Sequence, residues 1–90
     1  MHFTKYVVYI LFSSSMNKYY VGSTEHLSIR IDEHNRGKSS FTKKGIPWIL
    51  IHQIECESRS VAIQLEDKIK QRGISRYLDD VNSQGIGSAV

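Results

Sequence analysis

The sequence contains one cysteine, one proline and no long apolar run. Because Cys56 has no second cysteine to pair with, an internal disulfide is excluded and nothing points to an oxidising compartment. The N-terminal apolar segment, residues 6–12, is too short to cross a membrane, and no small-residue cleavage site follows a longer hydrophobic region. These absences predict a cytoplasmic protein that is neither exported nor anchored in a membrane.

Length and composition limit the chain to one small folded domain. Of its 90 residues 40% are apolar, which supplies about 36 side chains for a core. Charged residues make up 23%, and six glycines and one proline are too few for a collagen-like or linker-like chain. We expect a single domain over residues 1–82, followed by a flexible polar tail over residues 83–90.

The charges are nearly balanced in number but unevenly distributed. Twelve Lys and Arg against nine Asp and Glu give a net charge of +3, which is compatible with many kinds of partner. One segment carries four cations and no acid, namely Arg36, Lys38, Lys43 and Lys44. Such a segment is either a solvated loop or a surface that binds the phosphates of a nucleic acid.

Two segments near the N-terminus predict a β-hairpin. Residues 6–12 and 18–22 are dense in Tyr, Val and Ile, and the polar connection between them ends at Asn17. After the hairpin, Ser23 or Thr24 is expected to cap a helix that has Glu25 in its first turn. This helix is expected to end at residue 35 or 36, because Gly37 follows.

A third strand is predicted over residues 48–54, after a basic loop at residues 38–46 and Pro47. Alternation along a strand assigns its side chains to two faces. One face would carry Trp48, Leu50 and His52, and the other Ile49 and Ile51.

Two helices complete the predicted fold. Ser58 is expected to cap the first, which extends to about residue 71 and ends at Gly73, and the second covers residues 75–81. The buried stripe of the first consists of Val61, Ala62, Leu65 and Ile69. The order strand, strand, helix, strand, helix, helix predicts an α+β fold, a small three-stranded antiparallel or mixed sheet flanked by helices.

Three polar side chains lie at the borders of the predicted buried faces. Arg30 and His34 share one edge of the first apolar stripe, and Glu66 lies at the border of the next. A carboxylate in such a place is costly to desolvate unless it has a cation partner. Structural roles also remain open. Arg30 can pair with Glu33, Glu66 can pair with Lys70, and His34 can interact with the C-terminal end of the helix dipole.

An ordered set of residues carries a resemblance that single positions do not. The set consists of Tyr9, Tyr20-Val21-Gly22, Arg30, His34-Asn35 and Glu66. Together these residues resemble the GIY-YIG nuclease superfamily over residues 6–78, in particular small stand-alone members similar to the nuclease domain of the excision-repair endonuclease. Val7 replaces the usual glycine of the first triplet, and Ser23 stands where some relatives have a lysine.

The resemblance implies hydrolysis of phosphodiester bonds in DNA with one divalent cation, either Mg²⁺ or Mn²⁺. In this interpretation Glu66 holds the cation and Arg30 holds the scissile phosphate. Tyr9 acts as the general base or orients the attacking water, and Tyr20 supports it by hydrogen bonding. Gly22 lets the backbone turn into the first helix.

The proton acceptor has two candidates. A free tyrosine has a pKa of about 10 and is a poor base at neutral pH, so a nearby cation and Arg30 would have to lower the pKa of Tyr9. His34, with an ordinary pKa of about 6.5, is the alternative.

The basic loop gains a function in this interpretation. Its cations Arg36, Lys38, Lys43 and Lys44 would lie along the nucleic-acid backbone, which predicts an affinity that falls with rising salt. Phe41 and Trp48 are candidate stacking surfaces, with a core position favoured for Trp48. The predicted function is a metal-dependent DNA endonuclease acting in repair or recombination. The alternatives are a non-cleaving nucleic-acid-binding module of the same fold and a protein-interaction domain.

Overall fold

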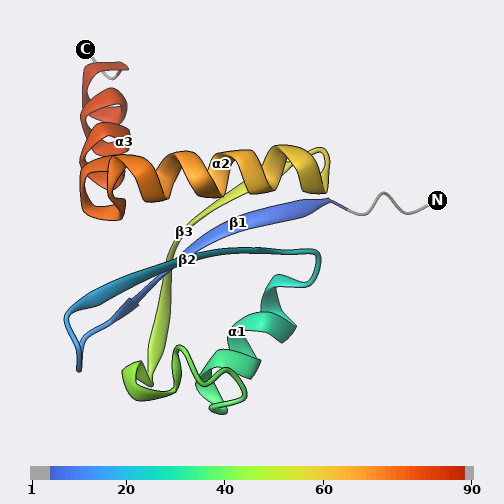
Figure 1. The fold of residues 1–90 in the computed structure, drawn as a ribbon. Helices are drawn as coiled ribbons and strands as arrows, with labels where there is room; N and C mark the ends of the chain where they lie inside the picture. The colour runs from blue at the N-terminus through green and yellow to red at the C-terminus, as the bar shows by residue number, and fades with distance from the viewer. Residues whose placement is uncertain (1–4, 89–90) are drawn as a thin grey trace.

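Three strands form one antiparallel sheet with helices on both of its faces (Figure 1). The computed structural model describes residues 5–88, with side chains as far as residue 83. The strands are β1 (Tyr6–Ser13), β2 (Lys18–Thr24) and β3 (Trp48–Cys56), in the order β2-β1-β3. The helices are α1 (Leu27–Asn35), α2 (Arg59–Arg72) and α3 (Ile74–Ser88), and a 3-10 turn, η1 (Lys43–Gly45), precedes β3. The predicted α+β fold and element order are confirmed, and the sheet is antiparallel.

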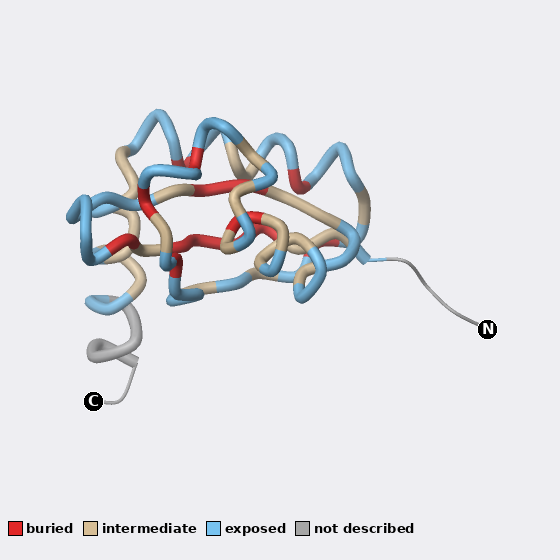
Figure 2. The backbone as a smooth tube through the Cα atoms, turned by 90° about the horizontal axis from the view of Figure 1, so that it is seen from below, coloured by how far each residue is buried: buried red, intermediate tan, exposed pale blue. Residues whose placement is uncertain are grey.

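The central strand β1 is buried on both faces, and its side chains divide the core into two layers. Val8 and Ile10 pack with α2, whereas Tyr9 and Leu11 point to the opposite face, which α1 covers. In Figure 1 α2 and α3 lie on one side of the sheet and α1 on the other. Figure 2 shows the most buried backbone in the strands between these layers. Tyr9 therefore belongs to the α1 layer.

Strand β2 is longer than the sequence suggests, and this moves the start of α1. Ser23 and Thr24 pair with β1 as the last residues of the strand, so neither caps the helix. Helix α1 begins at Leu27, and Glu25 lies before its first turn. The predicted helix start was wrong because β pairing satisfies these backbone groups instead. The predicted end is confirmed, since Gly37 follows with a φ of +77°.

Helix α2 has the predicted ends but a narrower buried face. Ser58 Oγ accepts a hydrogen bond from the backbone N–H of Val61 at 3.2 Å, and Gly73 ends the helix with a φ of +94°. Ala62 and Ile69 are buried, whereas Val61 is 48% exposed and does not belong to the stripe. One helical residue is a rotation of about 100°, which turns Val61 away from the sheet when Ala62 faces it.

Helix α3 is longer than predicted. It extends from Ile74 to Ser88, past the expected end at residue 81 and into the segment 83–90 that we expected to be a flexible tail. Residues 89–90 lie outside the described part of the chain. Within residues 5–88, none of the helices combines the length and the apolar character that a membrane crossing needs.

An irregularity in β3 changes which face His52 occupies. Leu11 pairs with Leu50 but the preceding residue Ile10 pairs with His52, so Ile51 is an extra residue at a β-bulge. Trp48 and Leu50 share the α1 face as predicted. His52 lies on the other face, with its ring 6.0 Å from that of Tyr77 in α3, because the bulge shifts the alternation by one residue.

Candidate active site

A buried chain of hydrogen bonds joins β1, α1 and the loop before β3. The Tyr9 hydroxyl lies 2.9 Å from Nε2 of His34, and Nδ1 of His34 lies 2.7 Å from Oγ1 of Thr42. Tyr9 is only 1% exposed, and His34 is fully buried. A neutral imidazole donates from one ring nitrogen and accepts at the other. Each nitrogen has one hydroxyl partner here, so the chain can pass a proton in a single direction.

Gly22 makes room for the Tyr9 ring. The two residues are direct partners across the β1–β2 ladder. A Cβ atom on Gly22 would lie 2.7 Å from the hydroxyl oxygen of Tyr9, 2.9 Å from its Cζ, and 3.1 Å from Cε2 of Tyr20. The turn role predicted for Gly22 was wrong, because the residue pairs inside β2 and the strand continues to Thr24. Its missing side chain serves close packing of the two tyrosines.

The two candidate proton acceptors have pKa values shifted in opposite directions. Burial raises the pKa of Tyr9 to about 12, and the neighbouring Tyr20 adds to this, while Arg30 opposes it. Burial lowers the pKa of His34, and the positive charge of Arg30 lowers it further. The sequence suggested that Arg30 would lower the pKa of Tyr9, but desolvation outweighs the guanidinium. At neutral pH the site therefore contains a protonated phenol and a neutral imidazole.

Tyr20 is the more accessible of the two tyrosines. It comes from β2, the strand at the edge of the sheet, and is half-buried. Its ring centre lies 5.0 Å from that of His34 and 6.3 Å from that of Tyr9. The sheet edge thus presents Tyr20 in front of the buried Tyr9–His34 pair.

Glu66 comes from α2, on the opposite face of the sheet, and approaches the same edge. Ser23 of β2 donates its hydroxyl to Oε1 of Glu66 at 2.9 Å. The charge of Glu66 also contributes to the raised pKa of Tyr9, as the smallest of the causes. The expected residues therefore fall into two sets, with Tyr9, Tyr20, Arg30 and His34 on the α1 face and Glu66 on the α2 face. β2 lies between the two sets.

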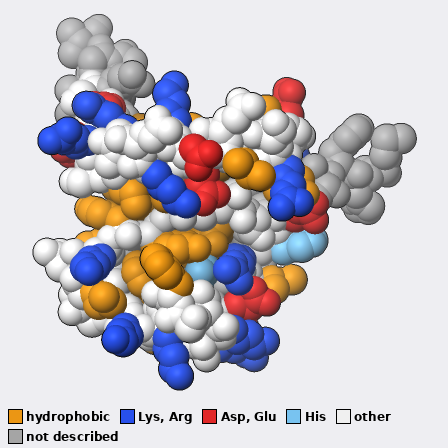
Figure 3. Space-filling view, viewed as in Figure 1, with side chains coloured by type: hydrophobic (Ala, Val, Ile, Leu, Met, Phe, Trp, Pro, Cys, Tyr) orange, Lys and Arg blue, Asp and Glu red, His pale blue; other side chains and the backbone are white. Residues whose placement is uncertain are grey.

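The surface of the molecule follows this division. In Figure 3 an apolar band separates the lobe of α2 and α3 from the lobe of α1, and acidic side chains over α2 border it. Lys and Arg side chains lie on both sides of the band. An extended, negatively charged strand placed along this edge would meet both sets of residues.

Both structural ion pairs that the sequence left open are present. Arg30 lies 3.1 Å from Glu33, and Nζ of Lys70 lies 2.9 Å from Oε2 of Glu66. The Lys70 side chain is 54% exposed, and that of Glu66 is 19% exposed. Surface pairs of this kind contribute little to stability, so they hold the two functional groups in place without committing them.

One carboxylate is the metal-binding group that the sequence predicted. Within the described residues, no cluster of three or more His, Cys, Asp or Glu side chains is arranged to hold an ion. Mg²⁺ commonly binds through one or two carboxylates and keeps several waters, with substrate phosphates as further ligands. Glu66 fits such a hydrated ion, provided that the exposed Lys70 ammonium moves off Oε2.

Sequence reasoning missed two supporting residues. Thr42 orients His34, and Ser23 orients Glu66. The contact between Ser23 and Glu66 spans 43 positions, and neither hydroxyl belongs to a local pattern. The one available signal was that Ser23 follows the second triplet directly.

The predicted basic surface is only partly involved in local pairing. Arg36 forms an ion pair with Asp32 at 2.9 Å, and Lys38, Lys43 and Lys44 are exposed. Trp48 is buried in the α1 layer, which confirms the favoured core position. Phe41, in the middle of the basic loop, is 85% exposed.

The small sheet between two helical layers, with paired tyrosines at its β2 edge, defines a nuclease-type fold. The chain matches the family model described as GIY-YIG catalytic domain over residues 5–77. The chain therefore belongs to the GIY-YIG family. This family consists generally of nucleases, which typically depend on a divalent metal, so membership implies a nucleic-acid substrate class.

A solved structure supports the same assignment. The chain is similar to the solution NMR structure of the UPF0213 protein BH0048 from Bacillus halodurans, with 26% sequence identity and a TM-score of 0.55. The similarity covers 90% of this chain and 86% of that protein. No curated protein matches the chain.

Proposed function

We propose that this protein is an endonuclease that hydrolyses phosphodiester bonds in DNA with one divalent cation, Mg²⁺ or Mn²⁺, in repair or recombination. Family membership supports the reaction class. The observation that carries the proposal is the buried hydrogen bond between Tyr9 and His34, next to Arg30. A phenol paired with a neutral imidazole beside a guanidinium can move a proton next to a bound phosphate.

Tyr9 and His34 act as one proton relay in this proposal. The Tyr9 hydroxyl takes a proton from the attacking water while its own proton passes to Nε2 of His34 over 2.9 Å. His34 is the final acceptor, and Nδ1 donates to Thr42. Because a free phenolate never forms, the raised pKa of Tyr9 does not stop the reaction. The two acceptors left open by the sequence are thereby successive members of one chain.

Arg30 and Glu66 contribute charge from the two sides of β2. Arg30 is partly exposed and binds the scissile phosphate, releasing Glu33 when it does so. Glu66, held by Ser23, keeps a carboxylate oxygen available for the cation. When bound, such a cation stabilises the negative charge that develops on the leaving oxygen. Lys38, Lys43 and Lys44 bind flanking phosphates.

Substitution of Glu66 tests the proposed function. Glu66→Gln is compared with Asp67→Asn, an exposed carboxylate next to it on α2, on branched, flapped and plain duplex DNA with Mn²⁺ or chelator. We expect Glu66→Gln to lose cleavage by about 100-fold or more, and Asp67→Asn to cleave like the wild type. Mn²⁺ is also expected to raise the melting temperature of the wild type and not that of Glu66→Gln.

The same panel separates the alternatives. Tight binding without metal-dependent cleavage would support a non-cleaving nucleic-acid-binding module. If no nucleic acid bound or shifted the melting temperature, a protein-interaction domain would be favoured.

The relay has its own test. Tyr9→Phe and His34→Gln are expected to reduce the rate similarly, and the double variant no further, because residues that act as one unit are not additive. Full cleavage by Tyr9→Phe together with loss in His34→Ala would remove Tyr9 from the mechanism.

A further inference from the structure

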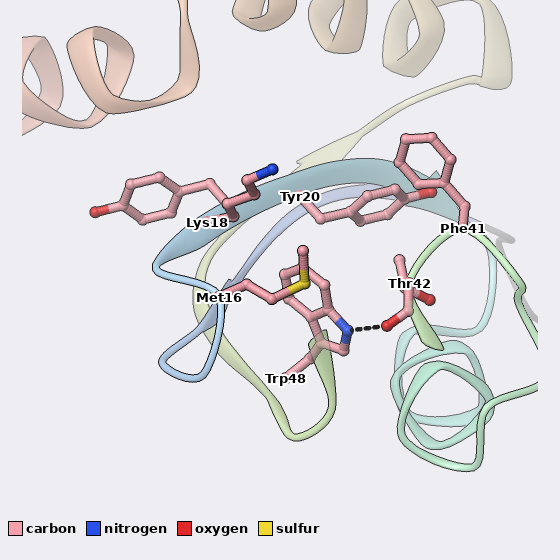
Figure 4. Close-up of a pocket in the computed structure, with 7 residues that line it drawn as sticks. Met16, Lys18, Tyr20, Phe41, Thr42 and Trp48 are labelled. Atoms are coloured by element: carbon pink, nitrogen blue, oxygen red, sulfur yellow. Dashed lines mark hydrogen bonds between the residues drawn. The ribbon is translucent and has the colours of Figure 1, made fainter. Parts of the chain in front are cut away.

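A pocket of about 250 Å³ opens beside the candidate active site, on the α1 face of the sheet (Figure 4). Its walls are Met16 from the hairpin loop, Tyr20 from β2, and Phe41 and Thr42 from the basic loop. Trp48, at the start of β3, forms a further wall, and its indole N–H donates to the carbonyl of Thr42 at 2.7 Å. The pocket is lined mainly by aromatic and apolar groups, with Lys18 at its border.

We propose that this pocket takes one unpaired nucleobase of the DNA strand that is cleaved. The proposal rests on the proposed function and names its substrate class. DNA with an unpaired nucleotide next to a duplex, such as a bulge, a flap or a single-stranded end, would be cut in preference to an uninterrupted duplex.

The size and lining of the pocket fit a flat aromatic group. Pockets for drug-sized ligands measure about 300–1,000 Å³, so this smaller space suits a single ring system. The ring of Tyr20 lies 6.0 Å from that of Phe41 and 6.2 Å from that of Trp48. The rings are inclined to one another, which leaves ring faces to receive a base. Phe41 stays 85% exposed although it lies near Tyr20, so burial in the core does not explain its position.

The location of the pocket connects it to the reacting groups. Tyr20 is a wall of the pocket and also lies against His34, at 5.0 Å between ring centres. Thr42 lines the pocket while its hydroxyl holds Nδ1 of His34. A base in the pocket would therefore bring its own phosphate close to Arg30, with Lys18 and the basic loop along the adjoining backbone.

The chemistry of the walls predicts stacking without selection of one base. The indole N–H and the Thr42 hydroxyl are already engaged within the protein. Few directional donors or acceptors remain to read the edge of a base, and stacking is tolerant of sequence because every base has a π face. The preference would be for an unpaired base of any identity.

The fluorescence of Trp48 gives a direct test, because it is the only tryptophan in the sequence. The wild type is titrated in chelator with a duplex that carries one bulged thymidine, and with the same duplex carrying an abasic residue at the bulge. We expect the thymidine bulge to quench Trp48 and to bind roughly 5- to 150-fold more tightly, the range for loss of one stacked base. Equal quenching and equal affinity for both duplexes would overturn the proposal.

A matched pair of variants removes the remaining ambiguity. Phe41→Ala changes an exposed side chain and leaves the core intact, and Val61→Ala changes an exposed apolar side chain of α2 on the other face. We expect Phe41→Ala to abolish most of the preference for the thymidine bulge and Val61→Ala to retain it. Retention in both variants would overturn the proposal.

Binding in chelator does not depend on cleavage, so the two proposals fail separately. Base-dependent quenching without metal-dependent cleavage would leave the pocket and remove the nuclease. Cleavage without any effect of the unpaired base would remove the pocket alone.

Discussion

Replacing Gly22 by alanine is expected to destabilise the protein, against the ordinary preference of a strand. Alanine normally stabilises a strand by about 0.5–1 kcal/mol relative to glycine. Here the added Cβ would lie 2.7 Å from the Tyr9 hydroxyl oxygen and 2.9 Å from Cζ. Tyr9 cannot move aside easily, because it is buried and bonded to His34.

The size of the effect follows from the cost of overpacking. Extra methyl groups in a packed core cost about 1–3 kcal/mol, which leaves a net loss of about 1–2 kcal/mol after the strand preference is subtracted. In a domain of this size that loss lowers the melting temperature by about 4–16 °C. Circular dichroism during heating measures it. A Gly22→Ala variant that melts at or above the wild-type temperature would refute the close-packing argument.

The Tyr9→Phe background isolates the cause. Phenylalanine lacks the hydroxyl oxygen, which is the atom nearest to the added Cβ. We expect Gly22→Ala to cost less in Tyr9→Phe than in the wild type, and the double-mutant cycle measures the difference. An identical cost in both backgrounds would mean that the hydroxyl is not the obstacle.

Two further predictions concern His34 and Asn35. The pKa of His34 is lowered on folding, so stability is expected to fall as pH decreases below about 6.5, where the unfolded chain takes up the proton first. Melting curves at several pH values measure this, and His34→Gln should flatten the dependence; a flat wild-type profile would contradict the shift. Asn35 bonds the backbone N–H and carbonyl of Trp48 at 2.6 and 3.1 Å. Asn35→Ala is expected to cost about 2 kcal/mol in urea unfolding, with the exposed Asn82→Ala as control, and an unchanged midpoint would count against it.

Local signals in the sequence predicted the elements that local chemistry controls. Ser58 caps α2 and Gly37 and Gly73 follow helix ends, because a side-chain acceptor and a positive φ are needed at those positions. The alternation of β1 likewise predicted that Tyr9 faces away from Val8.

Features that depend on distant partners were not predictable. The end of β2 depends on pairing with β1, which extends the strand through Thr24. The face of His52 depends on the bulge at Ile51, which no turn residue announces. For the site, residue types and order indicated the chemistry, but the hold of Thr42 on His34 arises only when the loop folds over α1. The placement of Glu66 on the opposite layer is also a tertiary feature.

The order of the strands limits how this protein can associate with other chains. Of the two outer strands, β2 carries the candidate active site along its free side, so a strand added there would compete with substrate. Growth of the sheet is left to β3, where Ile49, Leu50 and Ile51 are exposed and the bulge interrupts the ladder. Self-assembly and catalysis therefore occupy opposite margins of the molecule, and a dimer joined through β3 would hold two working sites facing outward.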